Sequence, residues 1–288
     1  MIVHLIDGTY ELFRAFFGAP SVRTADGREV GATRALLRSF TTMLREPEVT
    51  HVGIAFDTVI ESFRNQMFAG YKTGAGIDPT LLEQFPLVER ATRALGLVTW
   101  SMIEFEADDA LATFAARAAS DPAVTQVRIC SPDKDFCQCV RGDRVVLYDR
   151  KKRIALGDAG VVERLGVRPD RVTSYLALVG DTADGIPGVP RWGERSSAAV
   201  LARFADVASI PADPRAWGVS VRGADALARE LVQAREAAML YEQLATLRLD
   251  VPLTETVDDL RWRGANMDEL EQLCREIGVS DVTRKLGS

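Results

Sequence analysis

The chain has 288 residues, of which 47% are hydrophobic and 26% are charged, a length that allows one large domain or two small ones. Its formal net charge of −6, taken alone, argues mildly against a nucleic-acid partner. No apolar run is long enough to cross a bilayer, and the N-terminal MIVHLIDGTY has no basic leader before its apolar stretch. We therefore expect a cytoplasmic protein without a signal peptide.

The cysteines and histidines exclude several classes of catalytic site. The four cysteines, at 130, 137, 139 and 274, do not have the spacing of zinc ligands. The two histidines, His4 and His51, lie in apolar, strand-like runs where packed side chains are expected. Ser-His-Asp, Cys-His and histidine-rich zinc mechanisms therefore have little support. Any catalysis by this chain must rest on carboxylates.

Hydrophobic periodicity predicts an α/β part followed by a helical part. Up to residue 160, short apolar runs predict strands at 1–7, 51–57, 124–131 and 144–149, and longer periodic stretches predict helices at 31–46, 79–96 and 106–120. Strands that alternate with helices indicate βαβ units and a mainly parallel sheet. Further along the chain, helices are expected at 169–180, 194–204, 223–247 and 266–278. We predict an α/β domain over 1–165 and a helical region over 166–288.

Residues 62–80, SFRNQMFAGYKTGAGIDPT, form a long connection without clear periodicity. A segment of this kind in a compact domain is usually functional or mobile. Its mixture of Arg64, Phe68, Tyr71 and Lys72 with glycines suits contact with a phosphodiester chain. A disordered surface loop explains the same residues equally well.

Acidic residues follow three of the predicted strands. Asp7 ends the first strand, Asp57 ends the second, and Asp133 and Asp135 follow the strand at 124–131. Ligands of open parallel sheets bind at the carboxyl ends of the strands. A single aspartate there is best explained as a turn former, but acids after three strands indicate a site.

Two further acidic groups lie in or beside predicted helices. Glu106, Asp108 and Asp109 begin the helix at 106–120, where the helix dipole accounts for one or two of them. Asp181 and Asp184 lie in VGDTADGIPGV, which in isolation is best explained as a glycine-rich turn. Together with the acids after the strands they make nine carboxylates.

Convergence of nine carboxylates would require cations to offset their repulsion. Mg²⁺ takes oxygen ligands and substrate phosphate oxygens, and two such ions can activate water and stabilise a leaving oxygen in phosphodiester cleavage. With the nine set aside, 35 basic and 32 acidic residues remain, a balance of +3. The rest of the chain is then compatible with a nucleic-acid backbone.

Six stretches carry a resemblance to a known family. LIDGTYELFRAF, AFDTVIESFRNQMFAGYK, EADDALATFA, SPDKDFCQCV, LGVRPDRVTSYLALVGDTADGIPGV and LRLDVPL occur in this order along nearly the whole chain. The chain resembles the bacterial 5′-3′ exonuclease and flap endonuclease family, which includes the 5′-nuclease domain of DNA polymerase I. The resemblance implies a PIN-like (resolvase-like) α/β fold, with a mainly parallel twisted sheet flanked by helices, followed by a helical, SAM-fold-like helix–three-turn–helix region. It also implies a metal-dependent enzyme that acts on DNA with 5′ flaps, nicks or 5′ ends.

The resemblance implies roles for individual residues. Residues 62–80 would form the clamp or arch through which a 5′ single strand passes. The first metal (Mg²⁺ or Mn²⁺) would take Asp7, Asp57, Glu106 and Asp108, and the second metal region would take Asp109, Asp133, Asp135, Asp181 and Asp184. The expected catalytic residues are Lys72, Arg64, Asp7 and Asp108, with Lys72 neutralising the scissile phosphate or developing charge. The expected DNA contacts are Arg14, Phe13, Tyr71, Lys72, Gly188, Val189, Arg191, Gly193, Arg195 and Ser196.

The predicted hairpin at about 180–204 would contact duplex DNA through backbone amides and would hold K⁺ by carbonyl groups. This chain departs from the family pattern there, because Trp192 replaces an aliphatic residue and Arg195-Ser196 replaces Lys-Thr. In the clamp, Ala75 stands where an arginine is usual. Lys134 is expected to point away from the metals.

Three functions remain open at this point. The first is a metal-dependent 5′-3′ exonuclease or flap endonuclease in DNA replication or repair, free-standing because no polymerase region follows. The second is a catalytically weak, structure-specific DNA-binding paralogue, which the missing clamp arginine suggests. The third is a PIN-like nuclease that acts on RNA. No membrane or obligate protein partner is expected.

Overall fold

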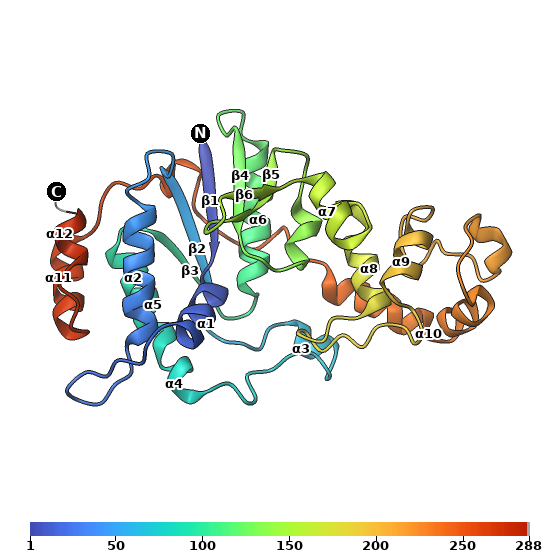
Figure 1. The fold of residues 1–288 in the computed structure, drawn as a ribbon, viewed down its shortest axis with the longest axis horizontal. Coiled ribbons are helices and arrows are strands. Elements are labelled where there is room, and N and C mark those ends of the chain that lie inside the picture. Colours follow the sequence, from blue (N-terminus) through green and yellow to red (C-terminus); the bar gives the residue numbers. More distant parts are fainter. Residues whose placement is uncertain (287–288) are drawn as a thin grey trace. The chain divides into compact units, whose positions relative to one another are not determined.

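The computed structural model describes residues 1–286 and divides the chain into two compact units (Figure 1). We call Met1–Ser62, Gly74–Ser131 and Leu249–Ser288 the sheet unit, and Phe63–Thr73 with Pro132–Arg248 the helical unit. Each unit is thus built from segments that are separated along the chain. These divisions differ from the predicted domain boundary near residue 165, which stays a prediction.

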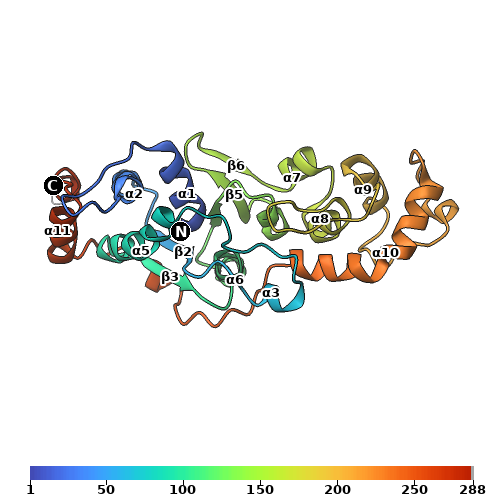
Figure 2. The same cartoon turned by 90° about the horizontal axis from the view of Figure 1, so that it is seen from below.

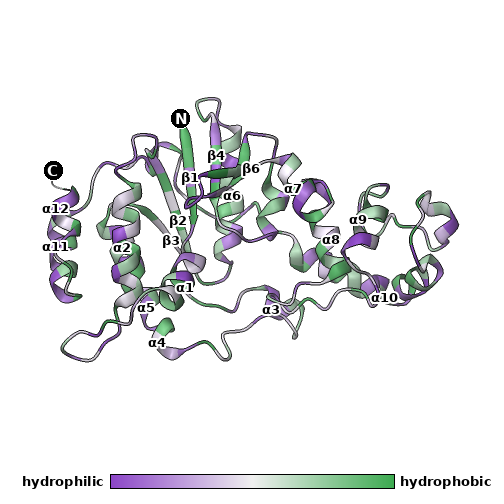
Figure 3. Cartoon of the chain, in the orientation of Figure 1, coloured by the Kyte–Doolittle hydropathy of each residue, from purple (hydrophilic) through white to green (hydrophobic). Residues whose placement is uncertain are grey.

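The sheet unit contains four parallel strands. They are β1 (Ile2–Asp7), β2 (His51–Asp57), β3 (Val98–Met102) and β4 (Gln126–Cys130), in the order β3-β2-β1-β4. The two central strands are almost continuously apolar and buried, as expected for a parallel sheet that is covered on both faces (Figure 3). The predicted parallel sheet is confirmed.

Right-handed crossovers decide which helices cover each face of this sheet. The chain moves from β1 to β2 to β3 in one direction, so α1 (Gly8–Gly18), α2 (Gly31–Met43) and α5 (Gln84–Ala94) share one face. It then returns from β3 to β4, so α6 (Ala107–Ser120) covers the opposite face (Figure 2). Short α4 (Pro79–Leu82) precedes α5. The crossovers bring the first residues of α1 and α6 to the carboxyl ends of the strands.

The C-terminal segment packs on the sheet unit. Its helices α11 (Met267–Glu276) and α12 (Val282–Leu286) lie against α5 and α2, and a 3₁₀ turn at Asp258–Leu260 lies against β2. Arg117 of α6 donates to the carbonyl oxygens of Glu255 at 2.6 Å and Leu253 at 3.0 Å. Residues 249–286 therefore help to cover the sheet.

The helical unit is built around α8 (Val172–Val179), which packs against α9 (Glu194–Leu201) and the long α10 (Ala224–Ala245). It also contains α3 (Arg64–Met67), the antiparallel pair β5 (Val145–Asp149) and β6 (Ile154–Leu156), α7 (Asp158–Leu165), and 3₁₀ turns at Asp135–Cys139, Pro169–Arg171 and Pro214–Trp217. Within residues 1–286, no helix has the length and apolar composition needed to cross a membrane.

Several elements were not predicted from the pattern. Among the α-helices and strands they are α1, α3, β3, β6, α7 and α12. In β3, only Trp100 and Met102 are buried, so the strand lacks the continuous apolar run of the central strands. For α1, the sequence signal that could have predicted the helix is its N-cap residue, Asp7. The Asp7 side chain accepts a hydrogen bond from the backbone N–H of Tyr10 at 2.8 Å.

Arg117→Met is expected to lower the free energy of unfolding by about 1–2 kcal/mol, because two charge-assisted hydrogen bonds to the C-terminal segment are lost. Urea denaturation measures this change, and hydrogen exchange should show faster exchange across residues 249–262. Arg275→Met is the control, since Arg275 pairs with Glu271 on the exposed face of α11. Equal stability and exchange in both variants would contradict this role for Arg117.

Candidate active site

The carboxylate of Asp7 joins elements at the carboxyl end of the sheet. Asp7 is the last residue of β1 and is paired in register with Ala55 of β2. While one oxygen caps α1, the other accepts a hydrogen bond from the Ser131 hydroxyl, just after β4, at 2.8 Å. Asp7 is 5% exposed, so its position is set by these bonds and not by solvent.

The first turn of α6 is fixed to the same end of the sheet. Asp57 ends β2, and its Oδ1 accepts a hydrogen bond from the Ala107 N–H at 2.7 Å. The Ser62 hydroxyl donates to Glu106 Oε1 at 2.7 Å, and Asp108 is half-buried beside it in the first turn. Asp57 is therefore hydrogen-bonded to the first turn of α6, where Glu106 and Asp108 lie. Ser62 and Ser131, which hold these acids, were not singled out from the sequence.

Asp109 has a structural position. Its side chain is 0% exposed, and Oδ2 accepts a hydrogen bond from the Glu106 N–H at 3.1 Å. This is half of a capping box, in which an acid at the third helical position satisfies the N-cap amide. The expected role of Asp109 in the second metal region stays a prediction, since buried carboxylates such as Asp135 also lie among the candidate metal-binding acids.

A second acidic group lies entirely in the helical unit. Asp135, Asp181 and Asp184 each place one carboxylate oxygen within 4.8 Å of the others, and we call these three residues the acid cluster. Asp135 begins the 3₁₀ turn after β4, while Asp181 and Asp184 come from the loop after α8. Asp133 is exposed and accepts a hydrogen bond from the Asp135 N–H at 2.9 Å. The structure thus brings three of the nine predicted acids together directly.

The surroundings of Asp135 in the acid cluster destabilise its ionised form. It is 4% exposed, and its Oδ1 has no hydrogen-bond donor. Burial raises the pKa of Asp135 well above its usual value, and repulsion from Asp133, Asp184 and Asp181 raises that pKa further, while Lys134 lowers it. A buried carboxylate in this position needs a cation to remain ionised. The donor set, with oxygen ligands alone, fits a hard divalent cation.

Lys134 reaches into the acid cluster. Its Nζ lies 2.5 Å from Asp181 Oδ2 and 3.8 Å from Asp135 Oδ1. Burial disfavours the charged ammonium, but the hydrogen bond to Asp181 and the charges of Asp135, Asp181 and Asp133 raise the pKa of Lys134 overall. Lys134 is therefore a charge partner of Asp181 and Asp135, and its expected orientation away from the metals stays a prediction.

The predicted clamp segment is attached to Asp184. The Lys72 Nζ lies 2.9 Å from Asp184 Oδ1, and the Lys72 N–H donates to the Asp184 carbonyl oxygen at 3.0 Å. The Tyr71 hydroxyl donates to Asp184 Oδ2 at 3.3 Å. Tyr71 is 3% exposed, and its expected contact with DNA stays a prediction. Its ring supports Lys72 and Asp184 from the interior.

Gly185 allows this close approach. Its φ is +73°, and a Cβ at this position would lie 2.2 Å from the carbonyl oxygen of Gly70. The loop is closed by reciprocal backbone hydrogen bonds of 2.8 Å between Asp181 and Ile186. Only glycine fits here, so the acid-bearing loop and the clamp segment are packed backbone to backbone.

Arg64 is buried against the C-terminal end of α10. It is 1% exposed, its Nε donates to the Leu244 carbonyl at 2.8 Å, and its Nη2 donates to the Thr246 carbonyl at 3.0 Å. These are carbonyl groups at the C-terminus of α10, where a cation also interacts favourably with the helix dipole. These bonds give Arg64 a structural position, and its expected catalytic and phosphate-binding role stays a prediction.

The predicted contacts on α1 remain accessible. Arg14 is half-buried and forms an ion pair with Glu11 on the same helix. The ring of Phe13 lies 6.5 Å, centroid to centroid, from the rings of both Phe17 and Phe85. Phe17 is 75% exposed and therefore extends this aromatic group to the surface.

The predicted hairpin corresponds to α8, the loop 180–193 and α9. The Val189 side chain is 3% exposed, and its N–H donates to the Leu178 carbonyl at 2.9 Å; its expected contact with DNA stays a prediction. Trp192 is buried against Trp217, with ring centroids 5.6 Å apart, so its bulk fills the interior. The other predicted contacts divide into buried Gly188, exposed Arg191, Gly193 and Arg195, and half-buried Ser196.

The α9 end of the hairpin has its own internal bonds. The Gly193 N–H donates to the Ser196 hydroxyl oxygen at 3.1 Å, and that hydroxyl donates to the Gly193 carbonyl at 2.9 Å. Arg191 adopts φ +70° and lies 3.7 Å from Glu230, while 67% of its side chain stays exposed. Arg191 and Arg195 are consequently the predicted hairpin contacts with exposed charge.

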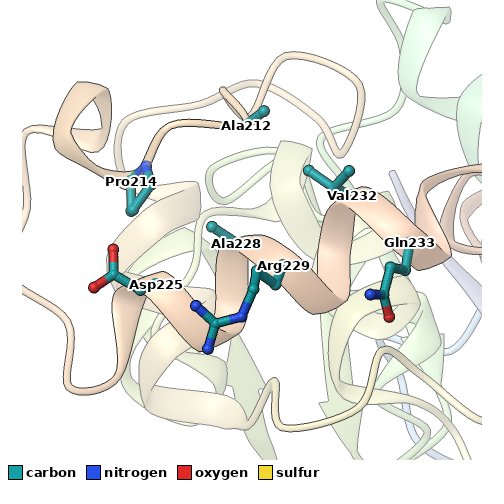
Figure 4. Close-up of a pocket in the computed structure, with 7 residues that line it drawn as sticks. All are labelled: Ala212, Pro214, Asp225, Ala228, Arg229, Val232 and Gln233. Atoms are coloured by element: carbon teal, nitrogen blue, oxygen red, sulfur yellow. The ribbon is translucent and has the colours of Figure 1, made fainter.

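A pocket elsewhere in the helical unit contains none of these residues. It is formed by α10 and the segment before the 3₁₀ turn at Pro214–Trp217, and Figure 4 shows Arg229 and Asp225 on α10 beside Pro214. Its lining residues are Ala212, Pro214, Asp225, Ala228, Arg229, Val232 and Gln233. The candidate site therefore rests on the acids and not on this pocket.

Comparison with protein families gives two matches that follow one another along the chain. A 5′-3′ exonuclease N-terminal resolvase-like domain matches residues 2–166, and a 5′-3′ exonuclease C-terminal SAM fold matches residues 167–268. Among curated proteins, DNA polymerase I of Bacillus caldotenax is 32% identical over 289 residues, and that of Pseudomonas aeruginosa is 33% identical over 282. The alignments cover 99% and 95% of this chain but 32% and 30% of those polymerases. The chain thus spans about a third of their length.

Solved structures share the fold. T5 5′-exonuclease with bound zinc is 17% identical with a TM-score of 0.68, covering 98% of this chain and 100% of that one. The catalytic core of Rad2 in complex with DNA substrate is 14% identical with a TM-score of 0.62, covering 98% and 89%. The fold predicted from the sequence is confirmed by both likenesses.

Arg64→Met is expected to lower the free energy of unfolding by about 2–4 kcal/mol, because buried carbonyl groups of α10 lose a charged donor. Urea denaturation of the free protein measures this loss. Arg191→Met, which removes an exposed guanidinium from the same unit, is the control and should change stability by less than about 0.5 kcal/mol. An Arg64→Met protein of normal stability but weakened DNA binding would contradict this structural role and support the predicted phosphate contact.

Proposed function

Because the chain belongs to the 5′-3′ exonuclease family, we propose that it hydrolyses DNA phosphodiester bonds at 5′ flaps, nicks and 5′ ends with the help of two divalent cations. The observation that carries this proposal is the acid cluster, in which a buried carboxylate oxygen without a donor faces two further carboxylates. Such a grouping destabilises the free protein and has a clear use only when cations bind. The proposal places the activity in DNA replication or repair, in the cytoplasm.

The metal-binding residues divide between the two units. In the sheet unit, Asp7, Glu106 and Asp108 would hold one ion, with Asp57 supporting the start of α6. In the helical unit, Asp135, Asp181 and Asp184 would hold the other, with Asp133 acting through water. When bound, such ions (Mg²⁺ or Mn²⁺) supply an activated water and stabilise the leaving oxygen.

The protein's own groups position the substrate. Lys72, whose ammonium lies on Asp184, would turn to the scissile phosphate and offset its charge. Arg14 and the exposed aromatic group around Phe13 would contact the 5′ strand. Arg191 and Arg195 would bind the duplex backbone beside the glycine-rich hairpin, whose carbonyls would hold K⁺.

Asp135→Asn is expected to reduce metal-dependent cleavage of a 5′-flap DNA duplex at least about 10³-fold, while flap binding in Ca²⁺ stays within about threefold of the parent, because the substitution removes a metal ligand and leaves the DNA-binding groups in place. Gel-based cleavage with Mg²⁺, Mn²⁺ or chelator measures the first quantity, and fluorescence anisotropy measures the second. Asp170→Asn, an exposed acid of the same unit paired with Arg168, is the matched control.

A parallel RNA flap of the same sequence separates the substrate classes. Faster cleavage of RNA than of DNA would contradict the proposed substrate. Tight flap binding by the parent protein without cleavage in any divalent cation would show a binding protein instead of a nuclease. Normal cleavage by Asp135→Asn would remove the acid cluster from the mechanism.

A further inference from the structure

The ammonium groups of two lysines form ion pairs with the carboxylates of the acid cluster. Lys72 contacts Asp184, whereas Lys134 spans two members of the cluster, hydrogen-bonded to Asp181 and 3.8 Å from the donor-free Oδ1 of Asp135. The second lysine therefore lies where the ligand atoms of a divalent cation converge. Neither the family resemblance nor the catalytic proposal gives Lys134 a function.

We propose that Lys134 is a built-in counter-ion that stabilises the acid cluster in the metal-free protein and competes with the divalent cation for Asp181 and Asp135. The inference rests on the proposed function only in assigning a cation to this cluster. An ammonium is a compact charge with three donors on a flexible stem, so it can occupy a carboxylate site and leave it without rearranging the backbone.

The surroundings of Lys134 allow this exchange. Its backbone is held by the turn that Asp133 caps and by the hydrogen bond from the Cys137 N–H to the Lys134 carbonyl at 2.9 Å. Its side chain is 32% exposed, compared with 6% for Asp135 and 5% for Asp181. The acids are thus buried, while about a third of the Lys134 side chain is exposed to solvent.

Lys72 contacts a different member of the acid cluster. Its ammonium pairs with Asp184, and its backbone N–H is bonded to the carbonyl of the same residue. Movement of the Lys72 ammonium would leave that backbone contact intact, but it would not open Asp181 or Asp135. Competition for these two carboxylates is therefore assigned to Lys134 alone.

A competing ammonium has two measurable consequences. Its removal should leave the acid cluster without its counter-ion in the metal-free state, so the protein without metal should melt at a lower temperature. A divalent cation should then bind more tightly, because it no longer has to displace a charge. A lysine with a purely structural role would instead lower stability with and without metal and would leave metal affinity unchanged.

The test is Mn²⁺ titration of the full chain by isothermal calorimetry, together with thermal melting in chelator and in saturating Mn²⁺. For Lys134→Met we expect about tenfold tighter binding at one site, a lower melting temperature in chelator, and a larger upward shift on addition of Mn²⁺. Lys134→Gln should show the same directions, and Lys134→Arg, which keeps the charge, should not bind more tightly than the parent. Lys152→Met, an exposed lysine paired with Asp149, controls for the loss of one positive charge.

Unchanged or weaker Mn²⁺ binding in both Lys134→Met and Lys134→Gln would overturn the inference, and so would an equal gain in Lys152→Met. Titration of Asp181→Asn separates this outcome from a failure of the proposed function. If Asp181→Asn leaves the parent's binding curve unchanged, the acid cluster holds no cation, and both proposals fall. These readouts do not depend on cleavage.

Discussion

Repulsion among the carboxylates of Asp135, Asp181 and Asp184 is the constraint on which the helical unit depends. Three oxygens lie within 4.8 Å of one another, and Asp135 is buried with one oxygen lacking a donor. Packing alone cannot stabilise such a group, because burial raises the cost of each like charge. The surrounding structure therefore supplies positive charge from Lys134 and Lys72. The same repulsion would favour binding of a divalent cation by this group.

The backbone around the acids is built to hold them against this repulsion. Gly185 lets the acid-bearing loop contact the clamp segment directly, and Arg64 anchors that segment to the end of α10. In the sheet unit the acids are held differently. The Ser131 and Ser62 hydroxyl groups and the α6 backbone donate hydrogen bonds to their carboxylate oxygens. The two sets of acids are thus positioned by separate means, each within its own unit.

The fold and the acids could be predicted because they depend on local patterns. Apolar runs identified three of the four strands of the sheet unit, and the acids at their ends followed from the rule for parallel sheets. Edge strand β3 was missed because its burial is discontinuous. Its omission also hid the fact that Glu106 and Asp108 follow a strand, as the other acids do.

The burial of individual side chains by distant parts of the chain could not be predicted from the sequence. Arg64, Tyr71 and Val189 look like substrate contacts in a basic, glycine-rich sequence, yet each is buried by partners distant in the chain. The contact of Lys134 with Asp181, 47 residues away in the sequence, could not be predicted from the residues next to Lys134. The spacing of residues in the sequence identifies acids at strand ends well. It does not show which groups the charged ends of long basic side chains contact.

The most direct measurement is anomalous diffraction from crystals of the full chain grown with Mn²⁺. The account predicts a peak coordinated by Asp135, Asp181 and Asp184, with the Lys134 ammonium moved away from Asp181. A Mn²⁺ peak elsewhere, with Lys134 still on Asp181 and the cluster empty at saturating metal, would contradict it.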